Sequence, residues 1–165
     1  MPVCPSCGTK VIMPSKGNHV LWLASKPNDE EYQYGRLMSG EVGDVIRKEF
    51  LGLIKIDPFT FSRASLWLHP IIKGKAGQGC FEIGVDTVLR FAADKRIIIL
   101  VGAEAVSHFT SLKVSDVTGL DVTSECSLFP NAERVFAMVN PGIAFTKGIG
   151  EVRFAINNMK DALYG

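Results

Sequence analysis

The chain has 165 residues, of which 47% are hydrophobic and 21% are charged. These values are typical of one soluble globular domain, spanning residues 1–165 and large enough to bury a core, and no stretch is long and apolar enough for a membrane span. The formal net charge of +1 argues against strong nonspecific nucleic-acid binding through bulk charge and is compatible with a local basic groove.

Residues 1–18 form a cysteine-bearing leader before the first predicted strand. The leader begins Met1-Pro-Val-Cys-Pro-Ser-Cys7, which has neither the basic start nor the apolar run of a signal peptide. We therefore expect a cytoplasmic protein. In that compartment cysteines are more often metal ligands or free thiols than disulfides.

Strands and helices alternate through the rest of the chain. We expect strands at 19–24, 62–68, 96–101 and 134–139, and helices at 40–56, 80–93, 103–110 and about 150–163, with a Gly/Lys-rich loop at 73–79. The run Ile97–Val101 is continuously apolar, as in a strand covered on both faces. The alternation predicts an α/β domain, three-layer α/β/α, around a central, mainly parallel four-stranded sheet.

The segment from Ala24 to Gly43 connects the first strand to the first long helix and carries glycines at 35, 40 and 43. Open α/β sheets place ligand sites at such strand-to-helix turns. Three glycines in nine residues suggest positive φ angles or close approach of a ligand. An ordinary connecting loop explains the same composition, so both interpretations stay open.

The first strand is followed by Ala24-Ser-Lys-Pro27-Asn28, by Glu31, and by the glycine-bearing segment from Gly35 to Gly43. With the later motifs below, which cover nearly the whole chain in order, these residues resemble the uracil-DNA glycosylase superfamily, most closely its iron–sulfur-containing branch. Ala24–Asn28 falls on the first motif of that branch, Glu31 on its following glutamate, and Gly35–Gly43 on Gly-x-Pro-Phe-Val-Gly-Arg-Ala-Gly without a gap. Later matches are the strand from Ser62 that ends in Pro70, the run Ile97-Ile-Ile-Leu-Val-Gly102-Ala-Glu-Ala105, and Val135-Phe-Ala-Met-Val-Asn140-Pro-Gly142 in place of the closing His-Pro-Ser motif. The Asn-Pro form is closer to the mismatch-specific thymine/uracil branch.

The chain departs from this family at four positions. Ser25 replaces the acidic residue of the first motif, Ala64 or Ser65 falls near an expected asparagine, Met38 replaces the aromatic that stacks on the base, and Asn140 replaces the closing histidine. The resemblance therefore implies the fold and the place of the site, and it leaves the excised base open.

The resemblance implies hydrolysis of the N-glycosidic bond of a flipped uracil or of a modified or mismatched pyrimidine in DNA. Such chemistry needs an extruded base, a polar group on the leaving base and negative charge near the sugar or the water. Asp29 or Glu31 would supply the charge, Asn140 an amide donor, and Ser25 and Ser65 would orient water or a base edge. Tyr34 and Met38 would form the pocket wall, and Lys26, Lys147 and the amides of Gly40, Gly43 and Gly142 would hold phosphates, with Pro27, Asn28, Gly35 and Pro141 completing the matched segments.

Other interpretations explain the same residues. Asp29, Glu30 and Glu31 are typical of a solvated acidic turn, and Asn140 is typical of a turn before proline. The absence of several expected polar residues also fits a catalytically inactive member of the fold that binds DNA or a protein partner, such as a phage or defence factor.

Cys4-Pro-Ser-Cys7 is a knuckle whose two sulfurs can share one metal ion or cluster. The resembled branch completes such a pair with two later cysteines; Cys80 matches one of them, and His69 stands near the other. We therefore expect a structural site of Cys4, Cys7, His69 and Cys80 that holds zinc or a 4Fe-4S cluster and ties down the leader. Cys126 competes as the fourth ligand and His19 is a weaker candidate, while a vestigial knuckle with Cys80 buried as a small apolar residue is the alternative.

Overall fold

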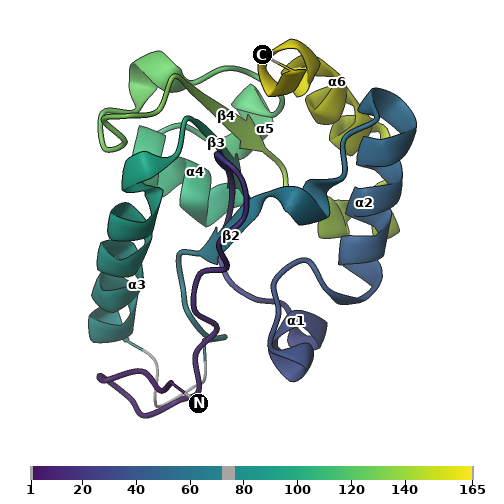
Figure 1. Cartoon of the computed structure of the whole chain (residues 1–165). Coiled ribbons are helices and arrows are strands. Elements are labelled where there is room, and N and C mark those ends of the chain that lie inside the picture. The colour runs from purple at the N-terminus through teal and green to yellow at the C-terminus, as the bar shows by residue number, and fades with distance from the viewer. Residues whose placement is uncertain (1, 72–76, 165) are drawn as a thin grey trace.

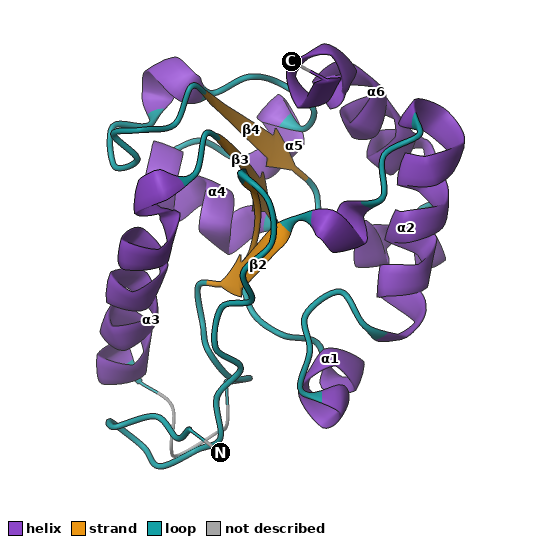
Figure 2. Cartoon of the chain, in the orientation of Figure 1, coloured by secondary structure: helices purple, strands orange, loops and turns teal. Residues whose placement is uncertain are grey.

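The computed structural model describes residues 2–71 and 77–164, so residues 73–76 of the predicted Gly/Lys-rich loop lie outside the described part. The four strands are β1 (Val20–Ala24), β2 (Ser62–Ser65), β3 (Ile97–Val101) and β4 (Arg134–Met138). They form one sheet in the order β2-β1-β3-β4, and every neighbouring pair is parallel. Figure 2 labels β2, β3 and β4 of this sheet. The predicted α/β class and four-stranded parallel sheet are confirmed.

Helices cover both faces of this sheet (Figure 1). The helices α2 (Gly40–Ile54) and α6 (Gly150–Tyr164) lie on one side, and α3 (Gln78–Phe91) and α4 (Ala103–Thr110) lie on the other. Because side chains alternate along a strand, β1 sends Trp22 into the core beneath α2 and α6, and Leu23 into the core beneath α3 and α4. The predicted three layers are therefore present.

A short helix, α1 (Asp29–Tyr34), lies where the acidic run Asp29–Glu31 suggested only a turn. The side chain of Asn28 accepts a hydrogen bond from the amide of Glu31, and the Glu31 carboxylate accepts one from the amide of Asn28, which together form a capping box. Gly35 ends α1 with a φ of 73°. This reciprocal capping makes a helix of a segment that has no apolar periodicity.

The remaining elements are α5 (Val114–Val117) and four 3₁₀ turns, namely η1 (Pro58–Thr60), η2 (Ala92–Asp94), η3 (Thr123–Glu125) and η4 (Pro141–Phe145). None of the described helices is long and apolar enough to cross a membrane.

Several element boundaries differ from the prediction. The helix predicted at 40–56 ends at Ile54, because Lys55 takes a left-handed conformation with a φ of 60°. The strand predicted at 62–68 ends at Ser65, and Trp67 and Leu68 instead pack beneath the leader. The helix predicted at 80–93 begins at Gln78 and ends at Phe91, where the η2 turn follows.

The leader runs along the β2 edge of the sheet. The backbones of Ser15 and Arg63 exchange two hydrogen bonds of 2.8 and 2.9 Å, and the amide of Ile12 donates to the carbonyl of Leu68 at 2.7 Å. A small apolar cluster joins the leader to the body of the domain through Cys4, Val11, Trp67, Leu68 and Cys80. The leader is thus packed onto the same domain, beside the end of β2.

Candidate functional site

A cavity of ≈ 440 Å³ lies at the carboxyl ends of the strands. Ala24 and Val101, the last residues of β1 and β3, line it, as do the segments that follow β1 and β4. Its volume falls within the range of about 300–1,000 Å³ that is common for ligand sites. The two bends that the sequence places after the first and last strands therefore share one cavity.

The structure divides the predicted site residues into two groups. Those on the cavity wall are Ser25, Lys26, Asn28, Glu31, Asn140, Pro141 and Gly142. Those outside the lining are Pro27, Asp29, Tyr34, Gly35, Met38, Gly40, Gly43, Ser65 and Lys147.

Four of the residues outside the lining have plain structural surroundings. Met38, predicted as a pocket wall, is only 1% exposed and packs in the core beneath α2. Ser65 is fully buried, and its hydroxyl donates to the carbonyl of Trp67 at 2.7 Å, so it does not orient water in the cavity. Pro27 is buried, and Asp29 is exposed in the first turn of α1.

The other residues outside the lining come from loops and helix ends. Tyr34 and Gly35 line a second groove of ≈ 390 Å³ between α1 and the leader. Gly40 has a φ of 80° and lies against the Glu30 side chain, and Gly43 lies against the carbonyl of Met38. Lys147 is exposed beyond η4. The glycine spacing thus reflects local packing of the loop, and the phosphate contacts predicted for Gly40 and Gly43 do not face this cavity.

Ser25 uses its hydroxyl to cap α4. Its Oγ accepts a hydrogen bond from the amide of Ala105 at 3.0 Å and donates to the carbonyl of Val101 at 3.0 Å. Gly102, which precedes α4, has no side chain to fill this role, and a Cβ there would lie 2.7 Å from Ser25 Oγ. Ser25 therefore satisfies a free amide at the start of the helix from a neighbouring strand.

Glu31 holds the connecting loop in place from the cavity wall. Its Oε1 accepts from the amide of Asn28 at 3.0 Å, and its Oε2 accepts from the amide of Met38 at 2.5 Å. Burial raises the pKa of the Glu31 carboxyl, and these two amides act in the opposite direction. The carboxylate is thus rigidly placed where the cavity meets α1.

Asn140 has one engaged and one free polar atom. Its Oδ1 accepts from the amide of Gly142 at 3.0 Å and caps the η4 turn. No hydrogen bond joins its Nδ2 to another residue of the part that the structure describes, and the residue lines the cavity. Asn140 is therefore a turn former and also presents an amide donor at the cavity.

Glu104 is a cavity residue that sequence reasoning missed. It lies in the first turn of α4, and its Oε2 accepts a hydrogen bond from Trp67 Nε1 at 2.5 Å. In the sequence, the run from Ile97 to Ala105 that contains Glu104 served only as a family match. The available signal was an acidic residue directly after an apolar strand, at the edge where parallel sheets place their sites.

A second constellation lies at the leader, away from the cavity lining. The ligand atoms of Cys4, Cys7, His69 and Cys80 all lie within 4.8 Å of one another. Three elements bring them together: Cys4 and Cys7 come from the leader knuckle, His69 follows β2, and Cys80 lies in the first turn of α3. Cys4, His69 and Cys80 are buried, which suits a structural site.

The side chains of this group have surroundings compatible with metal binding. His69 Nδ1 lies 2.7 Å from the carbonyl oxygen of Pro70, which can only accept, so Nδ1 carries the proton and the Nε2 lone pair is free. Nε2 lies 3.5 Å from Cys7 Sγ. The hydroxyl and amide of Thr9 lower the pKa of the Cys7 thiol to about 6, which favours the thiolate that metals bind. Three sulfurs and one imidazole are compatible with a structural metal or an iron–sulfur site.

The competing ligands do not join this group. Cys126 is buried in the core beneath α3 and α4, where burial raises the pKa of its thiol, and His19 is exposed just before β1. Among the residues that the structure describes, His69 rather than Cys126 completes the set.

A scan of the chain against protein-family models finds no match, and a search among curated proteins likewise finds no similar sequence. The two sites are therefore interpreted from their geometry and chemistry.

Proposed function

We propose that the cavity receives a base extruded from DNA and that the protein hydrolyses the N-glycosidic bond of a uracil or of a modified or mismatched pyrimidine. The observation that carries this proposal is the shared cavity of the segments after β1 and β4, each of which presents a polar side chain, Glu31 and Asn140. The resemblance to the uracil-DNA glycosylase superfamily requires this convergence, and the volume suits a base with its sugar.

In this proposal each residue has a defined task. Water bonds to C1′ of the sugar, the bond from C1′ to the base breaks, and the departing base takes a proton. The Glu31 carboxylate favours the cationic sugar, since each oxygen keeps a lone pair beyond the amide that it already binds. Asn140 Nδ2 donates to the leaving base, and Lys26, exposed at the rim, faces a phosphate.

The test is incubation with duplexes that carry uracil, a mismatched thymine or a hydroxymethylated pyrimidine, followed by alkali to cut abasic sites. We expect scission with at least one duplex, and a loss of about 10²-fold or more in N140A, the scale of a lost transition-state donor. E151Q, at an exposed glutamate in the first turn of α6, is the control and should act like the unaltered protein. The absence of scission with every duplex would contradict the proposal.

A second candidate is a catalytically inactive member of this fold that binds DNA or a protein partner. The observation that favours it is the structural use of the expected catalytic groups. Ser25 caps α4, Glu31 binds two amides, and Met38 lies in the core instead of stacking on a base. Measurable duplex binding without scission would support this candidate over the first.

We further propose that the Cys/His site holds one zinc ion with a structural role. Ligand atoms within 4.8 Å of one another suit a single tetrahedral ion. A 4Fe-4S cluster binds its ligands at four separate iron atoms and usually takes four thiolates. Free metal-binding thiols also fit the expected cytoplasmic compartment. Metal analysis and a visible absorption spectrum of protein purified without air test this, because zinc leaves the protein colourless and a cluster does not.

A further inference from the structure

Glu104 and Asn140 each contribute a polar atom on the cavity wall that remains available to a ligand. Oε1 of Glu104 and Nδ2 of Asn140 have no hydrogen-bond partner within residues 2–71 and 77–164, although Oε2 of Glu104 and Oδ1 of Asn140 each accept a hydrogen bond. One of these atoms can only accept a hydrogen bond and the other can only donate one.

The acceptor is held firmly. Trp67 Nε1 donates to Glu104 Oε2 at 2.5 Å, and the backbone amide of Trp67 donates to the carbonyl of Ser25 at 2.9 Å. Trp67 in turn packs in the apolar cluster with Cys4 and Cys80, beside the metal ligands. The first turn of α4 also favours a negative charge at Glu104. A ligand therefore meets a preorganised acceptor.

This pair of atoms discriminates between pyrimidines. A carboxylate oxygen needs a donor opposite it, and acidic side chains pair well with the N4 amine of cytosine. Uracil in a nucleotide donates only from N3–H, which has a carbonyl oxygen on each side of it. When N3–H donates to the carboxylate, these two carbonyl oxygens lie close to the same carboxylate. Such juxtaposed acceptors are a repulsive element in recognition.

We propose that the cavity takes a base with an exocyclic amine, of the cytosine type, in preference to uracil. Glu104 Oε1 accepts from the amine, and Asn140 Nδ2 donates to an acceptor atom of the ring. This inference rests on the proposed function, because it assumes that the ligand is a nucleobase, and it names the class of base.

The experiment uses single-stranded oligothymidine with one central deoxycytidine or deoxyuridine, so that no base pair has to open. Thymine presents the same edge as uracil and sets the background. The chain has 2 tryptophans; Trp22 lines the cavity and Trp67 binds Glu104, so their fluorescence reports binding there. We expect the deoxycytidine strand to bind about tenfold or more tightly than the deoxyuridine strand.

Two substitutions assign the preference to Glu104. E104Q keeps an oxygen for Trp67 and adds donor hydrogens, so it should remove or invert the preference. E104D keeps the carboxylate and should retain the preference with weaker binding, which covers the case that E104Q fails to fold. The matched control E151Q should leave the ratio unchanged.

The outcomes separate the two proposals. Equal binding of the two strands, or an unchanged ratio in E104Q, overturns the cytosine-type preference alone. If neither strand binds, the preference is overturned. If, in addition, no duplex is cut in the scission assay, the proposed function is overturned as well.

Discussion

Gly43 of α2 lies directly against the carbonyl oxygen of Met38, so that a Cβ atom on Gly43 would lie 1.8 Å from that oxygen. Met38 itself takes a left-handed conformation with a φ of 64°. The contact closes the first turn of α2 onto the loop that carries Met38, and Glu31 holds the same residue through its amide. The connection between β1 and α2 thus depends on the absence of a side chain at residue 43.

We predict that G43A destabilises the protein by about 1–3 kcal/mol, because the methyl group forces backbone shifts in a packed region. Urea unfolding measures the free energy. The control is G52A in the same helix, where residue 52 is exposed and a Cβ would meet nothing within 4 Å. G52A should stabilise α2 by up to about 1 kcal/mol through helix propensity. Equal stability of the two variants would contradict the contact.

The proposed metal site gives a second prediction. C80S removes one buried ligand, so it should lose the bound metal and lower the melting temperature by about 2–4 °C for each kcal/mol of metal-linked stability. A chelator should shift the unaltered protein in the same direction and leave C80S unchanged. Differential scanning calorimetry with metal analysis measures both effects.

C126S is the matched control, because Cys126 is also a buried thiol but lies in the core beneath α3 and α4, outside the ligand group. It should keep its metal. Metal loss in C126S, or an unchanged metal content in C80S, would show that the ligand set is wrong.

The sequence predicted the layers of this fold because the sheet is buried on both faces. Runs such as Ile97–Val101 are apolar at every position, so their identity as central strands needs no tertiary information. The position of the cavity followed from the same topology, since the carboxyl ends of parallel strands share one edge. The spacing of Cys4 and Cys7 indicated a metal knuckle, and the resemblance to the iron–sulfur-containing branch added Cys80 and His69, which the structure places with them.

Individual side-chain roles were not predictable in the same way. Met38 matched a pocket position in the aligned motif, yet the tertiary contact with Gly43 and the burial beneath α2 decide where it lies. The Glu104 side chain is positioned by a hydrogen bond from Trp67, which is 37 residues away in the chain. The helix α1 did leave a readable signal, since Asn28 and Glu31 have the spacing of a capping box.

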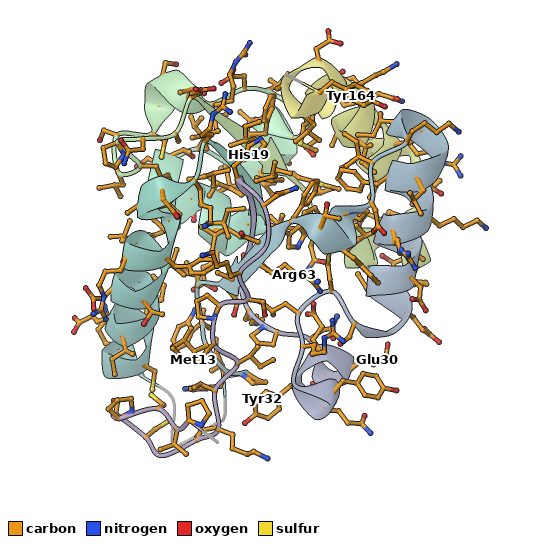
Figure 3. The ribbon with its side chains drawn as sticks, in the orientation of Figure 1. Met13, His19, Glu30, Tyr32, Arg63 and Tyr164 are labelled. Atoms are coloured by element: carbon orange, nitrogen blue, oxygen red, sulfur yellow. The ribbon has the colours of Figure 1, made fainter. Side chains whose placement is uncertain are left out.

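Arg63 on β2, whose side chain is labelled in Figure 3, also holds the same connecting loop. Its Nη1 donates to the carbonyl of Leu37 at 2.9 Å and its Nη2 to the carbonyl of Phe59 at 3.0 Å. Its guanidinium carbon also lies 5.3 Å from the centre of the Phe59 ring. Burial lowers the pKa of this guanidinium from its usual value. The side chain therefore links β2 to the loop before α2.

We predict that R63M destabilises the protein by about 1–3 kcal/mol, because it leaves two carbonyl groups without their donor. Hydrogen exchange at the amide of Met38 should also become faster, since the loop loses one of its two anchors. The control is R90M, which removes an exposed i,i+4 ion pair with Asp86 on α3 and should change stability by less than about 0.5 kcal/mol. Unchanged exchange at Met38 in R63M would rule out the anchoring role.

Glu31 makes the stability of the protein depend on pH in a defined direction. Burial raises its pKa in the folded state above the ordinary value of 4.5, so the folded protein holds the proton more tightly than the unfolded chain. The resulting contribution to stability is fully present below pH 4.5 and is lost as the pH rises through the raised pKa.

E31Q has no such titration, and its single carbonyl oxygen can accept from only one of the amides of Asn28 and Met38. We therefore predict that the stability of the unaltered protein, measured relative to E31Q, is greatest at acidic pH and falls as the pH rises toward neutrality. Urea unfolding of both proteins across this range measures the difference, with E151Q as an exposed control whose difference should stay flat. A difference that widens with pH would mean that the two amides outweigh burial and that the pKa of Glu31 is lowered in the folded protein.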